Sequence, residues 1–273
     1  MSFIQLPGGA VHYREMGQGQ TIILLHANPG DSQDFAAVIP ALAQHYRVLA
    51  LDWPGYGLSP AQADFCGASN AMQLLADFIQ VLNCGPVILL GNSLGGNAAV
   101  QYAARYPQNV SRLILISPGG FTAHNFFTRL FCRWQASRFA LPPSWFARIY
   151  LRKKTSVTKA MWQRAAGSQS TAATRILNRR IWRSFSQPAS DVRALARNLR
   201  QPVLLIFGAF DPVIPAWRDG RQARACIADA DLHTLPCGHA AFAEVPVLFL
   251  ESVFAFLDCS ADQSAEKSLQ QYK

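Results

Sequence analysis

The stretch that decides the fold is Leu89-Leu90-Gly91-Asn92-Ser93-Leu94-Gly95-Gly96-Asn97-Ala98-Ala99. An apolar run over residues 87–90 leads into a turn with Ser93 at its centre, and a pattern of small residues typical of a helix follows at once. Such a strand, turn and helix are the context of a nucleophile elbow, in which a strained backbone projects the serine Oγ into a cavity. Gly91 and Gly95 fit this turn because a Cβ at either position would collide with the neighbouring helix or strand. The stretch therefore predicts that Ser93 is a nucleophile.

Apolar runs that suit buried strands recur along the chain, at residues 21–25, 47–51, 86–90, 112–116, 203–208 and 231–235. Helical patterns separate most of these runs, and strands that alternate with helices predict a mostly parallel sheet covered on both faces. Residues 121–200 break the alternation, because they show helical patterns but no clear strand. We therefore predict an α/β fold with a core of residues 1–120 and 196–273. A helical cap, residues 121–195, is inserted after the strand that ends near Ser117.

The composition indicates a globular chain. The 273 residues are 50% hydrophobic and 15% charged, which suits a protein with a large core and excludes a disordered or coiled-coil chain. No apolar run reaches the roughly 18 residues of a membrane-spanning helix, and the N-terminus shows no basic region followed by an apolar block. We therefore expect a cytoplasmic protein. The six cysteines are scattered without a Cys-x-x-Cys pair, so we expect reduced thiols and no metal site.

Two residues further along the chain can activate Ser93. Asp211 stands just past the strand at 203–208, and His239 follows the last predicted strand. The carboxyl ends of parallel strands meet at one edge of a sheet, where catalytic groups gather. A serine hydroxyl needs a general base, and a histidine base needs a carboxylate to fix its tautomer and to stabilise the imidazolium. The order Ser93, Asp211, His239 is that of an α/β-hydrolase triad and differs from the orders in the two common serine protease folds.

Four motifs together give the chain a specific resemblance. They are Gly91-Asn92-Ser93-Leu94-Gly95-Gly96, Asp52-Trp53-Pro54-Gly55-Tyr56-Gly57-Leu58-Ser59, Gly208-Ala209-Phe210-Asp211-Pro212-Val213-Ile214-Pro215, and Gly238-His239 followed by Glu244 and Pro246. In this order they resemble the cap-bearing branch of the α/β-hydrolase fold superfamily, over residues 10–120 and 201–257. The resemblance implies that Ser93, Asp211 and His239 form the catalytic triad and that no metal or organic cofactor takes part. No motif in the predicted cap matches.

The resemblance also implies an oxyanion hole. One donor is the backbone N–H of Leu94, directly after the nucleophile at a helix N-terminus. The other is the N–H of Asn28, in the run His26-Ala27-Asn28, where relatives usually have His-Gly and a variable residue. An alanine at position 27 strains the loop if that position needs a positive φ. We expect His26 to bond loop backbone and Asp52 to fix its own glycine-rich loop, so neither is a second catalytic group.

We therefore predict a serine hydrolase that cleaves a carboxylic ester, or a related acyl compound of low polarity, through an acyl-enzyme. The first alternative is a hydrolase that cleaves a carbon–carbon bond next to a ketone, because Gly91-Asn92-Ser93 and Pro118-Gly119-Gly120 resemble the meta-cleavage product hydrolases. The alternative of another class is a non-catalytic ligand-binding protein on a hydrolase scaffold. A dehalogenase or epoxide hydrolase is disfavoured, because those relatives carry an Asp where Ser93 stands.

The predicted cap is strongly basic and rich in aromatic residues. Residues 121–200 contain 16 Lys and Arg and one acid, Asp191, so they carry a net charge of +15, whereas the rest of the chain carries −6. Three interpretations remain open: a solvated outer face over inward-packed aromatics, peripheral contact with an anionic membrane, and recognition of an acidic substrate or acyl carrier. We expect no nucleic-acid binding, because no such module is recognised. The expected substrate contacts are His124, Phe121 and Phe210.

Overall fold

The computed structural model describes residues 2–167 and 171–270, with side chains up to residue 258. Its centre is an eight-stranded sheet in the order β1-β2-β4-β3-β5-β6-β7-β8. The strands are β1 (Ser2–Leu6), β2 (Gly9–Met16), β3 (Thr21–Leu25), β4 (Arg47–Leu51), β5 (Val87–Asn92), β6 (Val110–Ile116), β7 (Val203–Gly208) and β8 (Asp231–Leu235). The pairs β1–β2 and β2–β4 are antiparallel and the remaining pairs are parallel, which confirms the predicted mostly parallel sheet.

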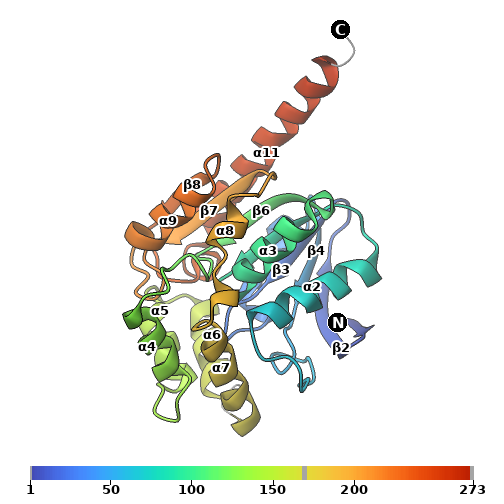
Figure 1. Ribbon diagram of the computed structural model, residues 1–273. Helices are drawn as coiled ribbons and strands as arrows, with labels where there is room; N and C mark the ends of the chain where they lie inside the picture. The colour runs from blue at the N-terminus through green and yellow to red at the C-terminus, as the bar shows by residue number, and fades with distance from the viewer. Residues whose placement is uncertain (1, 168–170, 271–273) are drawn as a thin grey trace.

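Helices cover both faces of the sheet (Figure 1). Successive residues of a strand point to opposite faces, and β3 and β5 are buried along their whole length because both faces are covered. Ile23 and Leu25 belong to the hydrophobic cluster on the side of α2 (Ala68–Leu82), α3 (Leu94–Arg105), α8 (Arg193–Ala196) and α9 (Arg221–Cys226). Ile22 and Leu24 belong to the cluster on the side of η1 (Ser32–Phe35), α1 (Ile39–Leu42), α10 (Ala241–Glu244) and α11 (Pro246–Gln270).

Between β6 and β7 the chain leaves the sheet. It forms the inserted helices, a name we keep for α4 (Phe126–Gln135), α5 (Pro143–Tyr150), α6 (Ser156–Ala166) and α7 (Ala172–Ser184). Figure 1 shows them as a group below the sheet, on the side away from the far end of α11. The short remaining elements are η2 (Pro107–Asn109), η4 (Pro188–Ser190) and η5 (Ala216–Gly220). In the described part of the chain, no helix has both the length and the apolar character needed to span a membrane.

Candidate active site

Ser93 lies in the turn between β5 and α3 and has a backbone φ of 52° with ψ of −106°. Residues other than glycine rarely adopt a positive φ, because the Cβ then crowds the backbone. The turn is also tightly packed. A Cβ on Gly91 would lie 2.5 Å from the carbonyl oxygen of Gly95, and a Cβ on Gly95 would overlap the carbonyl of Leu25. The collisions predicted for both glycines are confirmed, and the backbone of Ser93 has the strain of a nucleophile elbow.

The elbow is anchored to the end of β6. The N–H of Ser93 donates to the carbonyl oxygen of Ile116 at 3.1 Å, and the N–H of Gly119 donates to the carbonyl oxygen of Ser93 at 2.9 Å. Leu94 is the first residue of α3, and the first N–H groups of an α-helix have no acceptor within the helix. The positive end of the helix dipole lies at the same point. The N–H of Leu94 is therefore suited to bind an anion next to Ser93.

His239 and Asp211 form a buried hydrogen-bonded pair, with Nδ1 of the histidine 2.6 Å from Oδ2 of the aspartate. Oδ1 of Asp211 accepts the backbone N–H groups of Val213 and Ile214 at 2.8 and 3.1 Å. Burial by itself raises the pKa of Asp211, but the charge and hydrogen bond of His239, together with the two backbone donors, lower it on balance. Asp211 is thus held as a carboxylate that orients the imidazole through Nδ1.

Asn92, the last residue of β5, ties the elbow to the loop that carries His239. Its Nδ2 donates to the carbonyl oxygens of Ile116 at 2.9 Å and of His239 at 3.2 Å. The loop after β7 is joined to the same histidine loop, because the N–H of Phe210 donates to the carbonyl oxygen of Cys237 at 2.9 Å. The loops after β5, β7 and β8 therefore form one hydrogen-bonded unit at the carboxyl ends of their strands. No local sequence pattern predicts this role for Asn92, because its partners come from other segments of the chain.

Glu244 fixes the histidine loop to the inserted helices. Its buried carboxylate accepts the N–H groups of Gly238 at 3.0 Å and Ala240 at 3.2 Å, the residues on either side of the histidine. It also accepts the N–H groups of Arg152 and Lys153, at 2.8 Å each, in the connection between α5 and α6. Hydrogen bonds to a carboxylate are stronger than neutral ones. A sequence motif contains Glu244 but does not predict this role, because two of its partners are distant in the sequence.

His26 fixes the loop after β3. Its Nδ1 donates to the carbonyl oxygen of Ala27 at 2.7 Å, and its Nε2 accepts the N–H of Trp53 at 3.0 Å. Burial lowers the pKa of His26, which favours the neutral ring that this pair of bonds requires. The expectation that His26 bonds loop backbone is confirmed. Ala27 is not among the described residues with a positive φ, so the strain considered for alanine at this position does not arise.

Asn28 continues the same loop and contacts both the core and the inserted helices. Its Oδ1 accepts the hydroxyl of Tyr56 at 2.5 Å, and its Nδ2 donates to Oδ1 of Asn178 at 2.8 Å. Asn178 belongs to α7. The side chain of Asn28 is therefore held on both sides, which fixes the position of the backbone predicted to donate the second oxyanion hydrogen bond.

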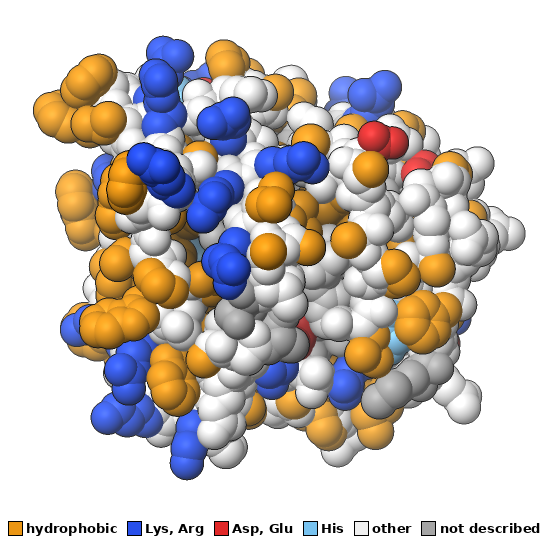
Figure 2. Space-filling model, turned by 90° about the horizontal axis from the view of Figure 1, so that it is seen from below, with side chains coloured by type: hydrophobic (Ala, Val, Ile, Leu, Met, Phe, Trp, Pro, Cys, Tyr) orange, Lys and Arg blue, Asp and Glu red, His pale blue; other side chains and the backbone are white. Residues whose placement is uncertain are grey.

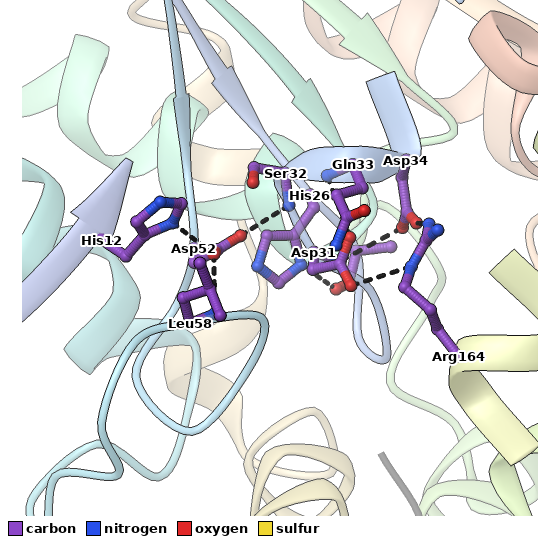
Figure 3. Close-up of polar contacts among 10 residues, drawn as sticks. His12, His26, Asp31, Ser32, Gln33, Asp34, Asp52, Leu58 and Arg164 are labelled. Carbon is purple, nitrogen blue, oxygen red and sulfur yellow. Dashed lines mark hydrogen bonds and ion pairs between the residues drawn. The ribbon is translucent and has the colours of Figure 1, made fainter. Parts of the chain in front are cut away.

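Asp52 supports this loop from the end of β4, as Figure 3 shows. It accepts the N–H of Ser32 at 2.6 Å and the N–H of Leu58 at 3.0 Å, and it lies 2.7 Å from Nδ1 of His12 on β2. One carboxylate therefore joins the start of η1, the glycine-rich loop and the sheet. This confirms that Asp52 fixes its own loop, and it gives His12 a supporting role.

Arg164 of α6 joins the inserted helices to η1 and to Asp31, the N-cap residue of η1 (Figure 3). Its Nε lies 2.9 Å from Asp31 and its Nη2 lies 2.5 Å from Asp34. Burial, followed by the neighbouring charge of Asp31, raises the pKa of Asp34 to about 7, although the guanidinium of Arg164 opposes the shift. Burial also raises the pKa of Asp31. Two acids of the core thus face one arginine of the insertion, close to the loop that carries Asn28.

A cavity of about 360 Å³ separates the elbow from the inserted helices. Ser93 and Asn28 line it on the core side. The other lining residues are mostly apolar or small: Gly119, Gly120, Thr122, His124, Asn125, Phe127, Thr128, Phe131, Cys132, Trp182, Phe185, Pro212, Val213, Ile214 and Arg218. Among the described residues, no three His, Cys, Asp or Glu side chains are grouped so as to hold a metal ion.

Of the three expected substrate contacts, His124 lines this cavity and the other two do not. Phe121 is fully buried in the hydrophobic cluster on the α3 side of the sheet, where a large apolar side chain is most favourably placed. Phe210 is 59% exposed in the turn before Asp211 and is not part of the lining. Neither Phe121 nor Phe210 lines the cavity, so their contacts with a substrate stay predictions.

A family model described as alpha/beta hydrolase fold matches residues 20–246. The chain belongs to the alpha/beta hydrolase fold family. This agrees with the mostly parallel sheet, its flanking helices and the elbow after β5, and it confirms the fold predicted from the four motifs.

Several members of this family resemble the chain along most of its length. A pimeloyl-[acyl-carrier protein] methyl ester esterase of Nitrosospira multiformis is 28% identical, over 90% of this chain and 98% of the esterase. A 2-hydroxy-6-oxo-6-(2'-aminophenyl)hexa-2,4-dienoic acid hydrolase of Metapseudomonas resinovorans is 26% identical, over 95% of this chain and 91% of the hydrolase. The crystal structure of a serine hydrolase involved in carbazole degradation superposes with a TM-score of 0.78, at 25% identity, and covers 94% of this chain and 98% of that one. The relatives thus include an esterase as well as a dienoic acid hydrolase, and this hydrolase family supports hydrolytic activity for the chain.

Proposed function

We propose that the chain is a serine hydrolase that cleaves a carboxylic ester through an acyl-enzyme, with Ser93, His239 and Asp211 as its catalytic triad. The observation that carries the proposal is the buried His239–Asp211 pair, on loops hydrogen-bonded to the strained turn of Ser93. A histidine whose Nδ1 is engaged by a carboxylate has Nε2 available as a general base. We infer that this base deprotonates Ser93, a serine in a strained strand-to-helix turn at the same edge of the sheet.

In the proposed reaction, Ser93 Oγ attacks the ester carbonyl carbon while His239 takes the hydroxyl proton. The carbonyl electron pair moves onto oxygen, and the N–H groups of Leu94 and Asn28 donate to the resulting oxyanion. When the intermediate collapses, the bond to the alkoxy group breaks and that oxygen receives the proton from His239. Water then attacks the acyl-enzyme with His239 as base, which releases the acid and restores Ser93.

The cavity supports an acyl substrate of low polarity. Aromatic side chains from the inserted helices, including Phe131 and Trp182, and aliphatic ones after Asp211 supply most of its wall. A volume of about 360 Å³ is within the range of small-molecule sites, which are lined mainly by apolar groups with a few polar ones. The relative from Nitrosospira multiformis is named as a methyl ester esterase, which favours ester cleavage among the reactions of this family.

A second candidate is the cleavage of a carbon–carbon bond next to a ketone. It is favoured by the relative from Metapseudomonas resinovorans, which is named as a dienoic acid hydrolase, and by two 2-hydroxy-6-oxo-6-phenylhexa-2,4-dienoate hydrolases at 28% and 26% identity. The two reactions are separated by assaying p-nitrophenyl esters of increasing acyl length beside a vinylogous 1,5-diketone acid. Turnover of the esters alone supports the first proposal, and cleavage of the diketone with little ester turnover replaces it with the second.

The nucleophile is tested with a fluorophosphonate probe, which bonds covalently to an activated serine and loses fluoride. We expect the wild type to be labelled and Ser93→Ala to be unlabelled. Ser156→Ala is the matched control, because Ser156 is an exposed serine at the start of α6, and it should be labelled like the wild type. If the folded wild type takes no label, the chain is a non-catalytic binding protein on a hydrolase fold and the proposal is wrong.

A further inference from the structure

Helix α4 carries an apolar stripe that faces outward. Its large apolar residues occur at spacings of one, three and four, which places them along one side of a helix: Phe126, Phe127, Leu130, Phe131 and Trp134. In a globular protein such a stripe normally packs against the core. Here Phe126 and Phe127 are 72% and 78% exposed, and the buried residues of the helix are Cys132 and Gln135. The helix therefore leaves much of its apolar side exposed to solvent.

The exposed surface continues beyond α4. Phe139 follows the helix, and Trp145 and Ile149 lie one turn apart on α5, all with large exposed fractions. We call the following residues the aromatic face: Phe126, Phe127, Leu130, Phe131, Trp134, Phe139, Trp145 and Ile149. Figure 2 shows hydrophobic side chains gathered on the left of the view from below, the side on which α4 and α5 lie in Figure 1. Exposed apolar patches of this kind mark interaction sites.

Cations lie among these aromatic side chains. Arg129 and Arg133 are exposed on α4, and the guanidinium of Arg138 lies 4.8 Å from the centre of the Phe139 ring. Figure 2 shows Lys and Arg side chains between the hydrophobic ones on this side of the molecule. The sequence contains no Asp or Glu between residues 121 and 190. The surface therefore combines exposed aromatic side chains with positive charges that no acid within residues 121–190 neutralises.

We propose that the aromatic face docks on an anionic lipid surface, with its aromatic side chains in the interfacial region and its arginines against the lipid headgroups. Amphipathic segments that lie on membranes combine Phe, Trp and Leu with Lys and Arg in this way. An acidic protein partner would need an apolar surface of its own to cover the aromatic side chains, in addition to acids that pair with the arginines. A lipid surface accommodates both kinds of side chain, because the apolar tips reach the acyl boundary while the guanidinium groups stay at the headgroups.

The cavity opens toward the same surface. Phe127 and Phe131 belong to the aromatic face and also line the cavity that contains Ser93. An amphiphilic acyl compound could thus pass from the lipid surface into the cavity along apolar side chains. This consequence rests on the proposed function, whereas docking itself does not require catalysis.

The docking is tested by co-sedimentation of the full-length protein with phosphatidylcholine vesicles and with vesicles that also contain phosphatidylglycerol. We expect retention by the anionic vesicles, weakened by high salt, and much weaker retention by the neutral ones. Arg129→Glu should reduce the partition coefficient by about fivefold or more. Arg105→Glu, on α3, is the matched control and should change it little. Equal and weak retention on both kinds of vesicle would overturn the proposal.

The aromatic contribution is tested with the double variant Phe126→Ala and Trp145→Ala, neither of which lines the cavity. We expect its partition onto anionic vesicles to fall about tenfold, with unchanged turnover of a soluble short-chain ester. Val81→Ala is the control, because Val81 is an exposed apolar residue near the C-terminal end of α2. If the double variant binds like the wild type, the cations act alone and the proposed seating of the aromatic side chains in the lipid interface is refuted. Ser93→Ala should bind vesicles normally, so a failure of catalysis and a failure of docking give different results.

Discussion

The Glu244→Gln substitution keeps the size of a buried side chain and removes one hydrogen-bond acceptor. In the structure, Oε2 accepts three backbone N–H groups and Oε1 accepts one, from Ala240. A glutamine can keep its carbonyl oxygen at the Oε2 position, but its NH₂ group then faces the N–H of Ala240. A buried donor without an acceptor costs about 1–3 kcal/mol, and the three remaining bonds lose their charge assistance. We therefore expect the free energy of unfolding to fall by about 3 kcal/mol.

The same substitution should impair catalysis, because Ala240 adjoins His239 in the chain. The NH₂ group of the glutamine repels the N–H of Ala240, and this repulsion moves the loop that carries His239. A displacement of about 1 Å in a catalytic group costs roughly 100-fold in rate. We expect kcat for a soluble p-nitrophenyl ester to fall by about 10- to 100-fold while KM changes little, which is the pattern of an interaction that acts on the transition state.

Urea unfolding and steady-state kinetics measure the two effects on the same preparation. Glu251→Gln, on the exposed side of α11, makes the same chemical change without these contacts and should leave both quantities near the wild-type values. If Glu244→Gln lowers stability but leaves kcat unchanged, the carboxylate joins two segments without positioning His239. If it changes neither, the assignment of four hydrogen bonds to this carboxylate is refuted.

Two further predictions follow from the buried acids. Asp211→Asn should lower kcat by roughly 10⁴-fold, as expected when an amide no longer fixes the histidine tautomer, while fluorescence-monitored unfolding stays cooperative; a loss of less than about tenfold would contradict the triad. The pKa of Asp34 is raised from its ordinary value of 3.8 to about 7. Between these two pH values the folded protein holds a proton that the unfolded chain has released. The stability that this proton contributes is therefore lost as the pH rises from 3.8 through about 7. In the wild type the free energy of unfolding should therefore fall between about pH 5 and pH 7.5, and in Asp34→Asn this fall should be smaller. An equal fall in the two proteins, measured by urea unfolding, would refute the pKa shift.

Much of the candidate site was predictable because it depends on strand ends. Apolar runs identify β5, β7 and β8, and parallel strands end at one edge of a sheet, so Ser93, Asp211 and His239 could be placed together without coordinates. The glycines around Ser93 could be explained in the same way, because a tight strand-to-helix turn excludes a Cβ whatever surrounds it. The family match confirms the fold, whereas the catalytic roles of the three residues remain proposals.

Other features depended on the direction in which a side chain points. The spacing of α4 predicts an apolar stripe, but only the packing of the helix shows that the stripe faces solvent. Phe121 and Phe210 looked like cavity residues from their positions in the chain, yet Phe121 is buried in the core and neither residue lines the cavity. Ala27 could have been strained, and the backbone shows that it is not.

Local sequence was thus enough to identify the sheet, the elbow and the order of the catalytic candidates, because these follow from chain periodicity and from steric limits on single residues. Tertiary structure decided what supports them. Glu244 binds backbone about 90 residues away, and Arg164 reaches acids 130 and more residues before it. Such contacts depend on how the inserted helices rest on the sheet, and a periodic pattern carries no information about that placement.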